Sequence, residues 1–204
     1  MKLPLIFLFA CHALAHAVER PAGFLGIAWG ASPEEVKRAL QKRPGVTFPE
    51  NADDYKIELT GGTFAGQPVA KWVIEFPERK FAVATVTLKT ESNASTVYKE
   101  FRNQLVSKYG SATTDKKTGG AGKKGAPPQP ATNVAIWKFM PTMKEKSTVL
   151  ISAEIAGATM KGNEETGGTV TIKYANETLT GAAAATAGGK PAPKTGAPVK
   201  KEDL

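Results

Sequence analysis

The chain contains almost no cysteine or histidine. Its single cysteine, Cys11, and both of its histidines, His12 and His16, lie within the first 16 of 204 residues. If residues 1–17 are removed as a leader, the remaining protein has neither residue type. Their absence excludes disulfide bonds, Ser-His-Asp and Cys-His catalysis, histidine acid–base chemistry and the usual ligand sets for zinc, copper, haem and iron–sulfur clusters. Stability must then come from an apolar core, which is feasible at this length.

No apolar run in the sequence is long enough to cross a bilayer. The longest covers about 13 residues, 3–15, whereas a transmembrane helix needs roughly 20. Lys2, this run and two overlapping A-x-A sites, the second ending at Ala17, are typical of a cleavable signal peptide. We therefore predict export, with residues 1–17 as the leader. A short buried helix and a lipoprotein leader that uses Cys11 in a loose lipobox are the alternatives.

The excess of positive charge is small in the segments expected to fold. The formal net charge is +8, yet residues 24–110 carry 12 basic and 10 acidic side chains, and residues 132–178 carry five of each. Residues 111–131 and 179–204 hold a larger share of the excess. Both are rich in Gly, Pro, Ala and Lys, which predicts a flexible loop and a disordered, low-complexity tail. A rigid basic groove for specific nucleic-acid binding is therefore not expected.

Two segments have the periodicity of amphipathic helices. In the first, Ser32 is a strong N-cap, Pro33 suits the first helical position and Glu35 completes a capping box. The second is expected over residues 95–109, with Ser95 as its cap and Gly110 as its C-terminal stop. Each helix offers one apolar side to a core.

Alternation of apolar and polar residues predicts strands after each helix. These segments are residues 55–59, 72–76, 81–90, 135–139, 149–155 and 170–174. Within a domain over residues 18–178, a helix followed by three strands occurs twice, in halves of roughly 24–91 and 92–178. We predict an α+β fold in which two helices cover one face of an antiparallel sheet. The halves are either two related half-domains, in a tandem αβββ repeat, or parts of one continuous sheet.

Five aromatic residues lie at or near these strands. They are Trp29, Trp72, Phe76, Trp137 and Phe139. The spacing within the strands favours a place in the core over a ligand groove. Burial of each can contribute roughly 1.5–3 kcal/mol.

Two stretches of the sequence resemble those of small bacterial exported proteins. Residues 25–36 (LGIAWGASPEEV) are similar to an opening that leads into the first helix, and residues 105–110 (LVSKYG) to a segment that ends the second. The helix-then-sheet organisation of such proteins resembles that of BamE-like envelope lipoproteins and of the β-lactamase-inhibitor-protein-like fold. The resemblance implies an exported α+β domain in which Gly26, Trp29 and Gly30 form a turn and a core plug. It implies no functional residue.

Three short patterns are compatible with cofactor binding, catalysis or a metal site, but each has a simpler structural explanation. Residues 120–125 match G-x-G-x-x-G, but they lie in a low-complexity segment and not between a strand and a helix, as dinucleotide binding requires. The pairs Asp53-Asp54 and Glu164-Glu165 are candidates for carboxylate catalysis, and the first pair also for a weak Ca²⁺ site. Adjacent acidic residues on a turn more often cap and solubilise it.

Together these patterns predict binding rather than catalysis. No catalytic, cofactor-binding or metal-ligating residue is assigned, and no cofactor is expected. We expect a non-enzymatic binding module of the cell envelope, periplasmic or secreted, whose partner is an envelope or extracellular macromolecule, a protein before any other class. One alternative is a small hydrolase or transferase that uses carboxylate, lysine or serine chemistry. Another is a weak binder of anionic envelope polymer through the lysines of residues 111–131 and 179–204.

Overall fold

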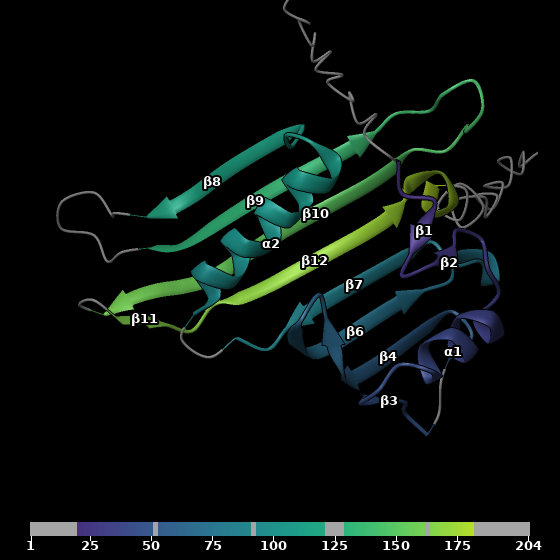
Figure 1. The fold of residues 1–204 in the computed structure, drawn as a ribbon, viewed down its shortest axis with the longest axis horizontal. Helices are drawn as coiled ribbons and strands as arrows, with labels where there is room; N and C mark the ends of the chain where they lie inside the picture. Colours follow the sequence, from purple (N-terminus) through teal and green to yellow (C-terminus); the bar gives the residue numbers. More distant parts are fainter. Residues whose placement is uncertain (1–19, 51–52, 91–92, 121–128, 162–163, 182–204) are drawn as a thin grey trace, which may run out of the picture.

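The computed structural model gives the fold over most of the chain (Figure 1). The described residues are 20–50, 53–90, 93–120, 129–161 and 164–181. The leader predicted over residues 1–17 lies outside them, as do residues 121–128 of the predicted loop and residues 182–204 of the predicted tail. Among the described residues, no helix has both the length and the apolar character that a membrane span needs.

The two predicted helices are present as α1 (Pro33–Gln41) and α2 (Ala94–Tyr109). The capping box predicted for α1 is confirmed. Ser32 Oγ accepts a hydrogen bond from the Glu35 backbone N–H at 3.3 Å, and Glu35 Oε2 accepts one from the Ser32 N–H at 2.8 Å. Two of the orphan donors at the start of the helix are thereby satisfied.

The strands are antiparallel and vary greatly in length. They are β1 (Gly23–Phe24), β2 (Ile27–Ala28), β3 (Val46–Thr47), β4 (Lys56–Gly61), β5 (Thr63–Phe64), β6 (Gln67–Glu75), β7 (Val83–Leu88), β8 (Thr114–Gly120), β9 (Gln129–Phe139), β10 (Val149–Lys161), β11 (Glu164–Thr166) and β12 (Thr169–Asn176). The main sheet follows the order β3-β4-β6-β7-β12-β10-β9-β8, with β5 paired to β6 and β11 to β10. β1 and β2 form a separate hairpin. The expectation of an α+β protein with an antiparallel sheet is confirmed, although strands outweigh helices.

The strand orders of the two halves mirror each other about the central pair β7–β12 (Figure 1). Strands β4, β6 and β7 of the first half lead to the centre, and β12, β10 and β9 of the second half lead away from it. The central pair is in register from Val83↔Ala175 to Leu88↔Val170. The sequence left open whether the two halves are separate half-domains or parts of one sheet. In the described residues they form one continuous sheet.

The flexible loop predicted over residues 111–131 is wrong in part, because residues 114–120 form the edge strand β8. This strand pairs with β9, and residues 129–131 are already part of β9. The second half therefore contributes four long strands where three were predicted. The G-x-G-x-x-G pattern begins at the end of β8, at Gly120, and its remaining residues lie outside the described part of the chain.

The edge position of β8 explains why its sequence lacks the signal of a strand. Lys116 and Lys117 are exposed on it, and lysine on an edge strand discourages pairing with other chains. The strand is attached to α2 by an ion pair between Arg102 and Asp115, in which Arg102 Nε lies 3.1 Å from Asp115 Oδ2. Backbone pairing and this ion pair hold a strand that has no apolar face of its own.

The first residues of the predicted tail are ordered, which corrects its predicted start. The composition predicts a tail from Leu179 onwards, but residues 177–181 form a helical turn. Asn176 is buried and its Oδ1 accepts a hydrogen bond from the Leu179 backbone N–H at 3.3 Å. The Leu179 side chain packs against a small cluster that includes Val83 and Ala175. The packing of Leu179 and this hydrogen bond, together with one from the Thr148 N–H to Thr178 Oγ1, hold this turn against the domain.

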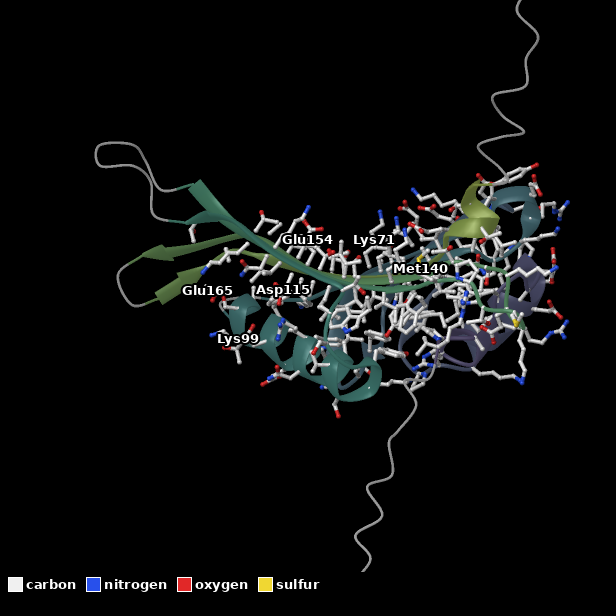
Figure 2. The ribbon with its side chains drawn as sticks, turned by 90° about the horizontal axis from the view of Figure 1, so that it is seen from above. Lys71, Lys99, Asp115, Met140, Glu154 and Glu165 are labelled. Atoms are coloured by element: carbon white, nitrogen blue, oxygen red, sulfur yellow. The ribbon has the colours of Figure 1, made fainter. Side chains whose placement is uncertain are left out.

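Helix α2 packs across β10 and β12 and lies on one side of the sheet (Figure 2). Lys71 and Glu154 project on the other side. The predicted aromatic core is confirmed for Trp72, Phe76 and Trp137, which are buried, whereas Trp29 and Phe139 are partly buried and pack against the same core. Both helices contribute buried side chains to this main core cluster.

Candidate functional site

Two tight turns with an unusual backbone stand at the edge of a cleft. Leu25-Gly26 joins β1 to β2 with φ of +54° and +80°, and Ala65-Gly66 joins β5 to β6 with φ of +48° and +83°. Two-residue hairpin loops of this kind have positive φ at both positions and prefer Asn, Asp or Gly. The second residue of each turn follows that preference. The first is an apolar residue with a Cβ, which disfavours the left-handed region.

Trp29 fixes the β1–β2 hairpin to the body of the protein. Its Nε1 donates a hydrogen bond to the Pro21 carbonyl oxygen at 3.0 Å, and its ring stacks on Phe81 with 5.1 Å between centroids. The Gly30 backbone N–H donates to the Phe81 carbonyl oxygen at 2.8 Å. The turn predicted at Gly26 is therefore present, and Trp29 packs against the core while it stays partly buried.

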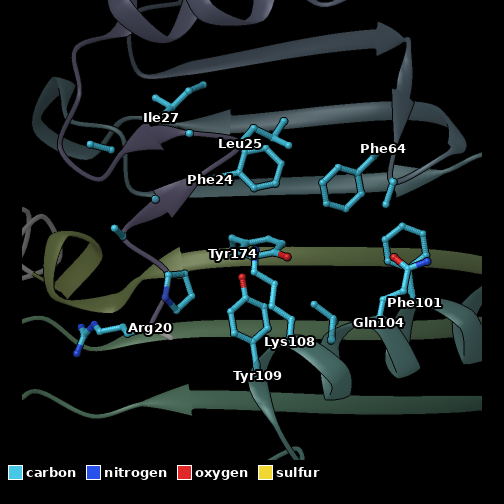
Figure 3. A pocket seen from close by; sticks show the side chains of 17 residues that line it. Arg20, Phe24, Leu25, Ile27, Phe64, Phe101, Gln104, Lys108, Tyr109 and Tyr174 are labelled. Carbon is cyan, nitrogen blue, oxygen red and sulfur yellow. The ribbon is translucent and has the colours of Figure 1, made fainter. Parts of the chain in front are cut away.

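The cleft lies between the β1–β2 hairpin, the Ala65-Gly66 turn and α2 (Figure 3). Its volume is about 530 Å³, within the range usual for small-molecule sites. Its larger apolar side chains are Phe24, Leu25, Ile27, Phe64, Phe101 and Leu105, and its polar ones are Arg20, Gln104, Lys108, Tyr109 and Tyr174. An apolar lining with a few polar groups is the usual composition of a ligand site.

The hydroxyls of two buried tyrosines are polar groups within this largely apolar lining. Tyr174 of β12 and Tyr109 at the end of α2 both line the cleft and are both buried. Burial is the main cause that raises the pKa of Tyr174, and the neighbouring Tyr109 raises it further. A tyrosine hydroxyl keeps its proton at neutral pH, and the raised pKa makes its ionisation still less favourable, so Tyr174 acts as a hydrogen-bonding group rather than as a nucleophile.

The rim of the cleft carries an amide and an unpaired cation on the same side of α2. Gln104 and Lys108 are one helical turn apart, and both are exposed. Lys108 Nζ lies 5.2 Å from the centroid of the Tyr109 ring. Among the described residues, no carboxylate forms an ion pair with Lys108. Its charge is therefore not neutralised by a neighbour.

Arg20, the other cation of the lining, is already engaged. Its Nε lies 2.8 Å from Glu145 Oε2, and its Nη1 donates to the Met140 carbonyl oxygen at 3.0 Å. Its Nη2 donates to both the carbonyl oxygen and, at 2.9 Å, the Oγ of Ser147. Arg20 thus ties the segment before β1 to the connection between β9 and β10, which is a structural role.

Both members of the first acidic pair singled out by the sequence have structural partners. Asp53 Oδ1 accepts a hydrogen bond from the Tyr55 backbone N–H at 2.9 Å, and Asp54 Oδ2 lies 2.9 Å from Arg79 Nη2. Neither pair lines the cleft. No group of three or more potential ligands that could hold a metal ion occurs among the described residues.

Glu165 of the second acidic pair corrects the prediction for the start of α2. Ser95 was expected to cap this helix, but the helix begins at Ala94, and the Ser95 backbone N–H donates to Glu165 Oε1 at 2.8 Å. A carboxylate from β11 therefore takes the capping role. It suits the positive end of the helix dipole better than a hydroxyl does.

The cleft itself was not predicted, although both stretches that resemble exported proteins contribute to it. Leu25 to Ala28 belong to the first stretch, and Leu105, Lys108 and Tyr109 to the second. They lie about 80 residues apart in the sequence and on opposite sides of the cleft (Figure 3). The tight turn at Gly26 was a signal for the hairpin, but nothing local indicated that the end of α2 would face it.

The chain matches no family model, and neither a curated protein nor a solved structure is significantly similar to it. The resemblance to BamE-like and β-lactamase-inhibitor-protein-like proteins stays a prediction from the sequence.

Proposed function

We propose that the protein is an exported, non-enzymatic binding module of the cell envelope and that the cleft is its binding site. The observation that carries the proposal is the composition of the cleft: an apolar interior lined by Phe24, Phe64 and Phe101, with polar groups gathered around Lys108 at one rim. Such a lining retains an apolar group and orients it by a few polar contacts. The leader predicted over residues 1–17 supports a periplasmic or secreted location.

In this proposal both helices lie on the face of the sheet that holds the common core. The opposite face then stays open around Lys71 and Glu154. Because α2 and the hairpin come from different halves of the chain, the cleft depends on the intact domain. A partner bound there would contact both halves at once.

A blocked cleft tests the proposal. Gln104→Trp places a large ring at the rim, and Asn103→Trp places the same ring on the neighbouring exposed position of α2, which does not line the cleft. Both purified proteins, checked by circular dichroism, are used to capture partners from a cell-envelope extract. We expect Gln104→Trp to capture at least about tenfold less of the partner than Asn103→Trp does. Equal capture by the two variants would refute the cleft as the binding site.

The two alternatives from the sequence remain separate proposals with their own tests. A hydrolase or transferase would lose activity on a single Asp or Glu substitution, whereas a binding module would keep its partner. The affinity for an anionic polymer would fall steeply as the salt concentration rises. It would also fall in the double variant Lys116→Gln and Lys117→Gln, which lacks two of the positive charges. Deletion of residues 111–131 is not a suitable test, because it removes the edge strand β8.

A further inference from the structure

We propose that the cleft binds a single-chain amphiphile with one carboxylate, a ligand of the fatty-acid class. The chain would lie between the β1–β2 hairpin and α2, and the carboxylate would meet Lys108 at the rim. This inference rests on the proposed function, whose site it shares, and it adds the chemical class of the ligand.

The apolar part of the cleft rests on a layer of packed aromatic rings that are themselves mostly buried. Phe64 stacks on Phe101 with 5.6 Å between ring centroids and an interplanar angle of 16°, and Phe24 lies 5.6 Å from Phe64 and 5.1 Å from Tyr174. These rings come from the β1–β2 hairpin, strand β5, α2 and the central strand β12. A flexible alkyl chain in the cleft would contact the parts of these rings that the cleft leaves exposed, together with Leu25, and its burial is favourable in proportion to its area.

The two strained turns place apolar groups at the edge of this layer of rings. Leu25 and Ala65 both line the cleft and both have positive φ. Asn or Gly would relieve that strain at either position but would offer no apolar side chain. Strained residues cluster at binding sites, where the surrounding structure holds them in place.

The charge of the rim matches a single negative group. Lys108 has no ionic partner among the described residues, Arg20 is neutralised by Glu145, and the lining includes no carboxylate. The Gln104 amide, one turn from Lys108, and the hydroxyls of Tyr109 and Tyr174 add hydrogen-bonding groups. One ammonium with neutral donors complements a monoanionic carboxylate, which would bind by a charge-assisted hydrogen bond.

The test uses laurate, its uncharged analogue dodecanol and the purified chain without its leader. Titration calorimetry and displacement of the fluorescent probe 11-(dansylamino)undecanoic acid measure binding below the micelle concentration. We expect laurate to bind saturably at one site and at least about tenfold more tightly than dodecanol. Lys108→Glu should weaken laurate binding at least about tenfold, whereas Lys108→Arg and Lys99→Glu, a reversal elsewhere on α2, should leave it within twofold.

Each outcome separates the ligand class from the proposed function. Absence of saturable laurate binding, or equal effects of Lys108→Glu and Lys99→Glu, overturns the fatty-acid proposal. If Gln104→Trp nevertheless abolishes capture of an envelope partner, the cleft binds something else, such as an apolar side chain of a protein, and the proposed function stands. If Gln104→Trp changes neither laurate binding nor capture, both proposals fail.

Discussion

The indole Nε1 of Trp137 donates a hydrogen bond to the backbone carbonyl oxygen of Gly110 at 2.8 Å. Trp137 is a buried residue of β9, and Gly110 ends α2 with a φ of +74°. The bond therefore connects the C-terminal end of the helix to the sheet. Because Lys108 and Tyr109 immediately precede Gly110, it also fixes the part of α2 that lines the cleft.

Loss of this bond should destabilise the whole domain. Trp137→Phe leaves the Gly110 carbonyl oxygen without its indole partner and replaces the bicyclic ring by a smaller one. We expect the free energy of unfolding to fall by about 2 kcal/mol, measured by urea denaturation. Trp29→Phe, at a partly exposed position, should cost less. A smaller loss for Trp137→Phe than for Trp29→Phe would contradict the anchoring role.

The sequence predicts those features that depend on neighbouring residues. The capping box at Ser32 and Glu35 and the alternation around Trp72 are local, and the structure confirms both. The strand β8 was missed because its stability comes from pairing with β9 and from the Arg102–Asp115 ion pair. Neither interaction leaves a periodic pattern in residues 114–120.

The cleft could not be predicted for a similar reason. It exists only where the hairpin at Leu25 meets the last turn of α2 at Lys108, and this meeting depends on the whole sheet between them. The sequence indicated both segments as noteworthy but could not place them in space. The capping group of α2 was mispredicted for the same reason. The Ser95 backbone N–H donates to Glu165, which lies 70 residues away in the sequence.

The contact between Glu165 and the start of α2 gives a second prediction. Glu165→Ala removes the acceptor of the Ser95 N–H and a negative charge at the positive end of the helix. We expect a loss of about 1 kcal/mol in the free energy of unfolding, measured by urea denaturation. Glu165→Gln keeps an acceptor oxygen and should lose less. If both variants unfold at the wild-type urea concentration, Glu165 has no capping role.

Protonation of Glu58 should lower the free energy of unfolding at acidic pH. Its carboxylate lies 2.6 Å from Lys56 Nζ and 2.6 Å from Lys71 Nζ, and these hydrogen bonds lower its pKa from 4.5 to about 2. A lowered folded-state pKa gives a contribution that is present above pH 4.5 and is lost as the pH falls toward 2. The side chain is exposed, so the contribution is small and is screened by salt.

Urea denaturation of the wild type and Glu58→Gln at pH 5.5 and pH 2.5 measures this contribution. We expect the wild type to lose more stability than the variant between the two pH values, because only the wild type protonates at this position. The difference should shrink in 1 M NaCl. Other carboxylates titrate in both proteins and cancel in the comparison. An equal loss in both proteins would show that the interaction with the two lysines does not stabilise the folded state.

The strain at Ala65 should be removable without damage to the core. Ala65 is exposed and has a φ of +48°, a conformation that glycine adopts freely. Ala65→Gly should therefore raise the free energy of unfolding by up to about 1 kcal/mol, and Tm by about 2–4 °C. Ala28→Gly is the matched control, because Ala28 is equally exposed but lies in β2 outside the left-handed region, where glycine only adds flexibility to the unfolded chain. Scanning calorimetry should show shifts of opposite sign, and a fall in Tm for both variants would mean that the turn is not strained.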